Sequence, residues 1–173
     1  NRYPLKELIL HPRVRTDYYK NTPNMPAFRG GFDGSRAPVC YNGDIFTISD
    51  YETLCGDYPE LDRVMLGRGI ISNPGLLDRI AAGTNSDGSG TDKETLKRFH
   101  QMIYEGYRQI MSGDRNVLFK MKELWACMIQ IFSDNGKYIK RIKKSQRLEE
   151  YETAAAAVFR DLDILEGAGF RTY

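Results

Sequence analysis

The spacing of hydrophobic positions changes halfway along the chain. In the first half, short apolar runs alternate with segments of helical spacing. Three runs predict strands, the first of them buried, at Leu8–Leu10, Val39–Asn42 and Asp62–Leu66. Helices are predicted at 25–32, from a cap at Ser49 or Asp50 through Cys55, and from Asn73-Pro74 to about Gly83. This alternation favours parallel βαβ units.

In the second half, the apolar residues follow helical spacing alone. The segment Asn85–Gly90 has the composition of a linker. Four amphipathic helices are predicted after it: from Thr91 or Asp92 to Met111, from about 116 to 132, around 139–142, and at 149–159. Because the loops between them are short, we expect an antiparallel helical bundle.

Glycines follow two successive predicted strands. Asn42-Gly43-Asp44 comes after the second strand, and Gly67-Arg68 comes after the third. In (β/α) barrels, phosphate often binds between the last two strand-to-helix loops, where backbone N–H groups donate to it and glycine permits a close approach. Each motif alone is equally typical of a turn. Together they predict a phosphate site, to which Arg68 adds a charged contact unless it forms a surface ion pair.

The predicted fold class is therefore α/β plus all-α. Residues 1–84 are expected to form the last three strands of a (β/α) TIM barrel, and residues 91–173 a helical domain. A complete barrel needs roughly 250 residues, and the chain has 173. Because the first residue is Asn, we expect the true N-terminus of the protein to lie upstream.

His11 lies at the carboxyl end of the first predicted strand, the edge where barrel enzymes carry their sites. A lone histidine is more often structural than functional. Arg13 and Arg15 follow closely, so we predict that His11 donates a hydrogen bond to a cofactor ring and that the arginines face phosphate groups. Either arginine can equally be a solvated loop residue.

Composition narrows the class of protein only slightly. Hydrophobic residues make up 41% and charged residues 28%, and no apolar run reaches about 18 residues, so we expect no membrane span. No signal peptide is expected. The three cysteines show no CxxC spacing, which favours a reducing cytoplasm and predicts neither a disulfide framework nor a metal site.

Local charge is more informative than the net charge of +2. Four basic residues follow i, i+3, i+4, i+7 spacing and so share one side of a predicted helix: Lys137, Lys140, Arg141 and Lys144. No acidic residue occurs between 137 and 147. Such a stripe is typical of a surface that contacts a nucleic-acid backbone, although a solvated helix face explains it equally well.

Taken together, the motifs resemble the C-terminal part of the tRNA-dihydrouridine synthase family. The matching segments are His11-Pro12-Arg13-Val14-Arg15 with Tyr19-Lys20, Pro38-Val39-Cys40-Tyr41-Asn42-Gly43-Asp44-Ile45, and Val64-Met65-Leu66-Gly67-Arg68-Gly69 with Asn73-Pro74. Their order and spacing agree with the family, and the linker and helical region follow. Family members usually carry a bulky aromatic residue after Asn-Pro, where this chain has Gly75.

The resemblance implies an FMN-containing barrel joined to a helical tRNA-binding domain, which reduces uridine in tRNA to 5,6-dihydrouridine with NADPH as reductant. It implies that His11 contacts the flavin. The residues implied to hold the FMN phosphate are Asn42, Gly43, Asp44, Gly67 and Arg68. RNA contacts are expected from Arg13, Arg15 and the basic helix. The family's catalytic cysteine and flavin-contacting lysine belong to earlier strands, so no catalytic residue is expected in this chain.

We expect this part of such an enzyme to show little catalysis by itself and to self-associate through open strand edges. Two alternatives stay open. A different FMN or phosphate-binding barrel oxidoreductase would need no basic helical tail, and tRNA affinity that falls steeply with salt would argue against it. A non-catalytic helical RNA-binding module would lack a cysteine and a lysine in the upstream strands.

Overall fold

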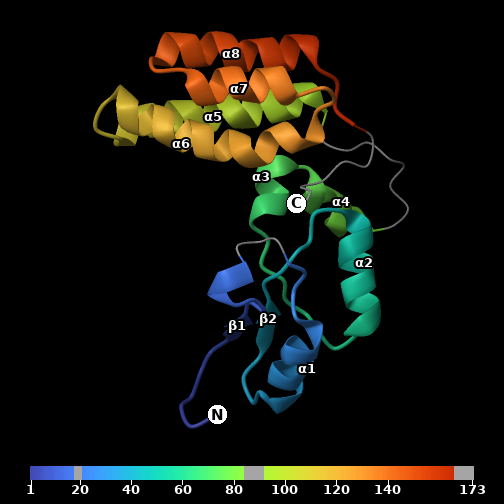
Figure 1. The fold of residues 1–173 in the computed structure, drawn as a ribbon. Helices are drawn as coiled ribbons and strands as arrows, with labels where there is room; N and C mark the ends of the chain where they lie inside the picture. Colours follow the sequence, from blue (N-terminus) through green and yellow to red (C-terminus); the bar gives the residue numbers. More distant parts are fainter. Residues whose placement is uncertain (18–20, 84–91, 166–173) are drawn as a thin grey trace. The chain divides into compact units, whose positions relative to one another are not determined.

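The computed structural model describes residues 1–17, 21–83 and 92–165 (Figure 1). The chain divides into two compact units, one formed by Asn1–Gly67 and one that begins at Arg68. The chain is mostly helical, with a two-stranded parallel sheet in the first unit. The motif residues Tyr19 and Lys20 and the predicted linker at 85–90 lie outside the described residues.

The sheet of the first unit consists of β1 (Leu8–Leu10) and β2 (Val39–Tyr41), in the register Leu8 to Val39 and Leu10 to Tyr41. Figure 1 shows α1 (Met25–Gly34) connecting the two strands. The predicted third strand is shorter than expected. It reduces to one parallel bridge between Tyr41 and Val64, in which Met65 N–H donates to the Tyr41 carbonyl at 2.8 Å. All three segments therefore run in the same direction, with β2 in the middle.

Aromatic packing holds α1 against this sheet. The Phe28 side chain is 1% exposed, and its ring centroid lies 4.9 Å from that of Tyr41 and 5.0 Å from that of Tyr58. The prediction that β1 is buried is wrong for Ile9, which is 48% exposed. Alternate strand residues face opposite sides of a sheet, and Leu10 packs on the core while Ile9 lies on the opposite face.

A capping box starts α2 (Ile48–Asp57) two or three residues earlier than the sequence predicted. Thr47, not Ser49 or Asp50, is the N-cap, and its Oγ accepts from the Asp50 N–H at 3.2 Å. The Asp50 carboxylate in turn accepts from the N–H groups of Phe46 and Thr47, both at 2.9 Å. This reciprocal arrangement fixes the loop that joins β2 to the helix.

Helices make up the second unit. Their bounds are α3 (Arg68–Ser72), α4 (Leu76–Ala82), α5 (Lys93–Ile110), α6 (Asp114–Met128), the 3₁₀ turn η2 (Ile129–Ile131), α7 (Gly136–Lys144) and α8 (Leu148–Asp161). The sequence did not predict α3, and Pro74 precedes α4 instead of opening it. Asp92 caps α5 as predicted, because its carboxylate accepts from the Thr95 N–H at 2.7 Å.

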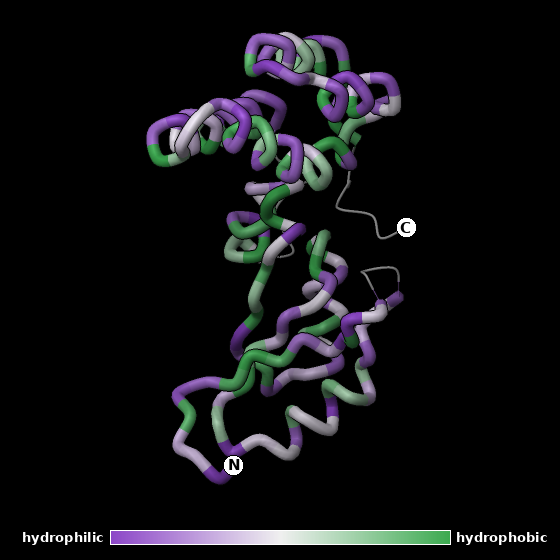
Figure 2. The backbone as a smooth tube through the Cα atoms, turned by 60° about the vertical axis from the view of Figure 1, so that its left-hand side comes forward, coloured by the Kyte–Doolittle hydropathy of each residue, from purple (hydrophilic) through white to green (hydrophobic). Residues whose placement is uncertain are grey.

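The core of the second unit lies between α5, α6, α7 and α8. Hydrophilic and hydrophobic colours alternate along the turns of these helices in Figure 2, as amphipathic packing requires. Trp125 and Tyr151 are fully buried. The Tyr151 hydroxyl accepts from Trp125 Nε1–H at 2.9 Å and lies 2.5 Å from His100 Nε2, to which it donates. None of the described helices has the length and apolar character that a membrane crossing requires.

Candidate functional site at the carboxyl edge of the sheet

The predicted site residues of the first two strands meet at one edge of the sheet. His11 follows β1 and Asn42 follows β2, and parallel strands bring these ends together. His11 Nδ1 lies 2.5 Å from the Asn42 carbonyl oxygen, and the Asn42 N–H donates to the Leu10 carbonyl at 2.9 Å. Because a carbonyl only accepts, Nδ1 carries the proton and Nε2 of the exposed ring faces outward as an acceptor.

An ion pair joins the same two loops a second time. The Arg13 guanidinium donates to both carboxylate oxygens of Asp44, at 2.7 and 2.5 Å. It also donates from Nε to the Asn21 carbonyl at 3.1 Å. The Arg13 side chain is only 3% exposed, and this hydrogen-bonded pair raises its pKa above the usual value. Arg13 therefore holds the Asp44 loop in place, and its charge is already paired within the protein.

Position 43 has to be glycine because the Tyr41 side chain occupies the space that a Cβ would need. A Cβ at this position would lie 2.0 Å from the Tyr41 hydroxyl oxygen and 2.2 Å from Cζ. Tyr41 is 3% exposed, and burial raises its pKa to about 12. Its hydroxyl donates to the Met25 Sδ atom at 3.7 Å. Within the described residues, Gly43 N–H has no acceptor, so the loop keeps one donor for a ligand.

Gly67 and Arg68 have different surroundings. No atom lies within 4 Å of a Cβ built on exposed Gly67, so packing does not require glycine there and the space above it is open. Gly67 closes the first unit, and Arg68 opens α3 in the second. Burial raises the pKa of the Cys127 thiol on α6, and the positive charge of Arg68 partly lowers it again. Arg68 therefore lies close to Cys127.

A hollow of about 450 Å³ opens at the carboxyl end of β1. His11, Arg13 and Asn24 are among the residues that line it. The sequence analysis did not predict a role for Asn24. Its side chain caps α1 by accepting from the Ala27 N–H at 3.0 Å. The signal was present, since Asn two residues before Pro26 is typical of a helix start.

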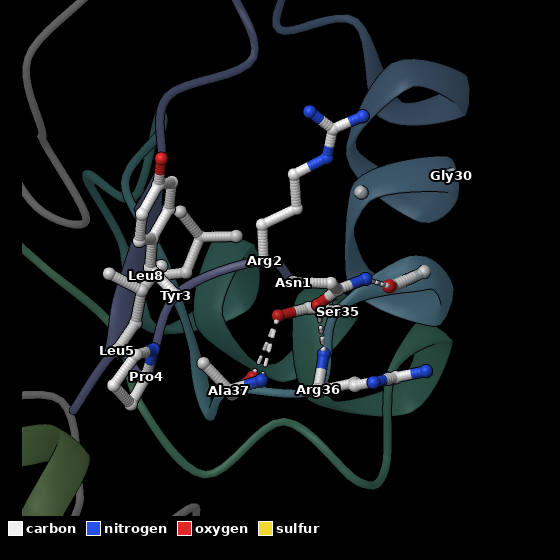
Figure 3. A pocket seen from close by; sticks show the side chains of 12 residues that line it. Asn1, Arg2, Tyr3, Pro4, Leu5, Leu8, Gly30, Ser35, Arg36 and Ala37 are labelled. Atoms are coloured by element: carbon white, nitrogen blue, oxygen red, sulfur yellow. Dashed lines mark hydrogen bonds between the residues drawn. The ribbon is translucent and has the colours of Figure 1, made fainter.

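A second hollow, of about 520 Å³, lies at the opposite end of the strands (Figure 3). Its lining comes from the segments that lead into β1 and β2, from the first residue of β1 and from α1, and the Asn1 side chain crosses it. Asn1 Nδ2–H donates to the Gly34 carbonyl at 2.6 Å, and Asn1 Oδ1 accepts from the Arg36 N–H at 2.9 Å. No carboxylate or histidine of the described chain lines this hollow. The chemistry-bearing groups lie at the carboxyl edge instead.

The predicted basic stripe lies on α7, within the second unit. Its four residues are exposed, and none forms an ion pair with another described residue: Lys137, Lys140, Arg141 and Lys144. The Lys137 ammonium lies 4.9 Å from the centroid of the Tyr138 ring. Arg15, in the turn η1 (Arg15–Asp17), is exposed as well. In the described ranges, no three His, Cys, Asp or Glu residues are placed to hold a metal ion.

Known proteins resemble this chain along most of its length. The family model described as dihydrouridine synthase (Dus) matches residues 5–167. Three curated proteins named tRNA-dihydrouridine(16) synthase are similar to it. The protein of Aquipseudomonas alcaligenes is 32% identical over 44% of this chain and 24% of its own length. The protein of Pseudomonas putida is 28% identical over 70% of this chain and 37% of its own length. The protein of Neisseria meningitidis serogroup B is 23% identical over 90% of this chain and 47% of its own length. The chain thus spans at most about half the length of these relatives.

Proposed function

The chain belongs to the dihydrouridine synthase family, and we propose that it is the C-terminal part of an FMN-dependent enzyme that reduces uridine in tRNA to 5,6-dihydrouridine. The observation that carries this proposal is the double link between the β1 and β2 loops. His11 contacts Asn42 and Arg13 holds Asp44, so both loops present their residues at one edge. Parallel βα architectures place ligands at that edge.

The residues at this edge fit a phosphate-bearing cofactor. Gly43 N–H is a donor without a described acceptor, and Gly67 leaves open space beside the same sheet edge. Backbone N–H groups exposed by glycine are suited to bind a phosphate group. We propose that Asn42, Gly43, Asp44, Gly67 and Arg68 form the phosphate-binding part of the FMN site, with the Asp44 carboxylate acting through Arg13.

FMN, when bound and reduced by NADPH, would supply the hydride for the uracil ring. His11 is positioned through Nδ1 by the Asn42 carbonyl, and it lines the hollow at the carboxyl end of β1. The neutral ring can only accept at Nε2, so the predicted donor role toward the cofactor requires a proton on both nitrogens. No described residue of this chain is assigned as the proton donor to uracil; we expect that group in the rest of the enzyme.

The finer architecture belongs to the same proposal. Residues 1–84 would contribute the last three strands of a TIM barrel, and residues 91–173 an antiparallel helical bundle that binds cytoplasmic tRNA. Arg15 and the exposed cations of α7 are the proposed RNA contacts. Arg13 is not among them, because its guanidinium pairs with Asp44 and its side chain is 3% exposed.

Gly67→Val in the complete enzyme tests the proposed cofactor site. The wild-type protein should purify with an FMN absorbance spectrum and should form dihydrouridine in tRNA, at position 16 if it follows the relatives named above. Gly67→Val should lose most of its FMN while it stays folded, because the new side chain enters open space. Gly30→Ala, in equally open space on α1, is the matched control and should keep its flavin. A wild-type enzyme without flavin or dihydrouridine formation would overturn the proposal.

We further propose that the 173-residue chain self-associates through β1. Among the described residues, no strand pairs with the second edge of β1, and Ile9 is 48% exposed beside it. Unpaired edges invite pairing with another chain, and a lysine at the edge opposes it. Light scattering should give a mass above the monomer for the wild type and the monomer mass for Ile9→Lys. Leu77→Lys, which alters an exposed residue of α4, is the control. A monomeric wild type would refute self-association.

A further inference from the structure

An exposed aromatic side chain stands in a basic groove of the second unit. The groove has a volume of about 640 Å³ and lies between the first turns of α6 and the connection from α7 to α8. Phe119 is 70% exposed at its side, whereas the neighbouring Leu118 is buried. Arg115 and Lys122 precede and follow Phe119 by four and three residues, so all three side chains share one face of α6. The Phe119 ring is therefore not part of the hydrophobic core of the second unit.

The cations of this groove are available to a ligand. Lys122 Nζ donates to the Ser145 carbonyl at 2.5 Å, which fixes the ammonium at the groove and leaves two of its three donors. Arg115 is exposed and forms no ion pair with another described residue. Arg147 contacts Glu150 at 3.0 Å, but its side chain is 73% exposed. Three cations therefore line the same groove as the aromatic ring.

The two acidic residues of the lining do not cancel this charge. Asp114 and Glu149 lie in the first turns of α6 and α8, respectively. The amino-terminal ends of helices carry a partial positive charge, which offsets carboxylates placed there. The lining carries three cations and two carboxylates, so the side chains alone leave a net positive charge.

The groove is continuous with the basic stripe on α7. A neighbouring hollow of about 460 Å³ is lined by Arg141 and Lys144 of α7, by Ser145, and by Glu149 and Glu150 of α8. Glu149 lines both hollows, and the Ser145 carbonyl is the group that holds Lys122. A row of cations thus extends from α7 to Phe119. Single-stranded nucleic acids are bound by this combination, a basic path for phosphates with aromatic rings on which bases stack.

We propose that Phe119 is a stacking platform for one unpaired base of tRNA, with Arg115 and Lys122 on the flanking phosphates. The inference rests on the proposed function, because it takes tRNA as the ligand. A protein partner is disfavoured, since protein interfaces have apolar centres of low charge, whereas Phe119 is a single apolar group among cations. The proposed α7 contacts bind the phosphate backbone of tRNA, whereas Phe119 would bind a base.

Binding of an unmodified tRNA transcript to the complete enzyme tests this proposal. Phe119→Ala should weaken binding about tenfold, as expected for the loss of one stacked base. The slope of affinity against salt should stay unchanged, because no cation is removed. Arg115→Ala should reduce that slope by about one phosphate contact. Met102→Ala, which truncates a 67% exposed side chain of α5, is the control and should bind as the wild type does.

Phe119→Trp provides a direct readout. It should retain binding, and tRNA should quench the added indole, while the native Trp125 is fully buried and reports little. The thermal midpoint of each Phe119 variant should match the wild type, because the side chain is exposed. If wild-type enzyme binds tRNA and Phe119→Ala binds it equally well, the stacking site is wrong. A Phe119→Ala variant that changes only the oligomeric state would identify a protein contact instead. Failure of the wild type to bind tRNA at all would count against the proposed function itself.

Discussion

Replacing Gly43 with alanine is expected to lower the free energy of unfolding of the first unit by about 3 kcal/mol, at the upper end of the usual cost of overpacking. The new Cβ would lie 2.0 Å from the Tyr41 hydroxyl and 2.2 Å from Cζ. Tyr41 packs edge-on against Phe28 and is 3% exposed, so its ring cannot swing aside without disturbing the core. Tyr41→Phe should not rescue the variant, because Cζ and Cε1 still collide.

Amide hydrogen exchange of the β2 backbone is the appropriate measurement, because the single tryptophan, Trp125, belongs to the second unit. Gly67→Ala is the matched control, as its Cβ meets no atom within 4 Å. Faster exchange in β2 for Gly43→Ala, with exchange in α6 unchanged, is the expected pattern. Equal protection of β2 in the two variants would show that the Tyr41 ring yields to the new methyl group.

Lowering the pH from 7 to 4 is expected to destabilise the second unit by about 3 kcal/mol through His100 alone. His100 is 6% exposed, and burial lowers its pKa from 6.5 to about 4. Its Nε2 accepts from the Tyr151 hydroxyl, which favours the neutral ring. The unfolded chain binds the proton more readily, so this stabilisation is complete above pH 6.5 and is lost as the pH falls toward 4.

Urea unfolding followed by Trp125 emission measures this dependence, since His100 and Trp125 belong to the same core and their ring centroids lie 5.2 Å apart. His100→Gln is the control variant: its amide can accept from Tyr151 but does not titrate. The difference in unfolding free energy between wild type and His100→Gln should shrink steadily between pH 6.5 and 4. A difference that is constant over this range would mean that His100 is charged in the folded protein.

The long periodic helices could be predicted from the sequence, whereas the short helix α3 and the exact start of α2 could not. Regular spacing located α5, α6 and α8 to within a few residues. The five-residue helix α3 carries too few turns to display a period, and its glycine, Gly69, argues against a helix. The start of α2 was misplaced because Thr47 and Asp50 cap it jointly, and a reciprocal pair is harder to recognise than a single cap.

At the candidate site, sequence analysis found the residues but not their mutual contacts. Parallel strands imply that His11 and Asn42 share an edge, and they do. The pairing of Arg13 with Asp44 joins residues that are 31 positions apart, and spacing cannot predict which charges meet over that distance. The sequence also could not show why position 43 is glycine. The Tyr41 ring excludes a side chain there, and the rotamer of Tyr41 depends on how α1 packs against it.

The part-buried Arg13–Asp44 pair ties the loop after β1 to the loop after β2, so the two loops form one structural unit. Breaking a buried pair by removing one partner costs more than the pair contributes. A chimera between this protein and a relative should therefore take 11–44 from one parent, with its crossover points outside that range. Homologues that lose the arginine should have changed position 44 in the same lineage.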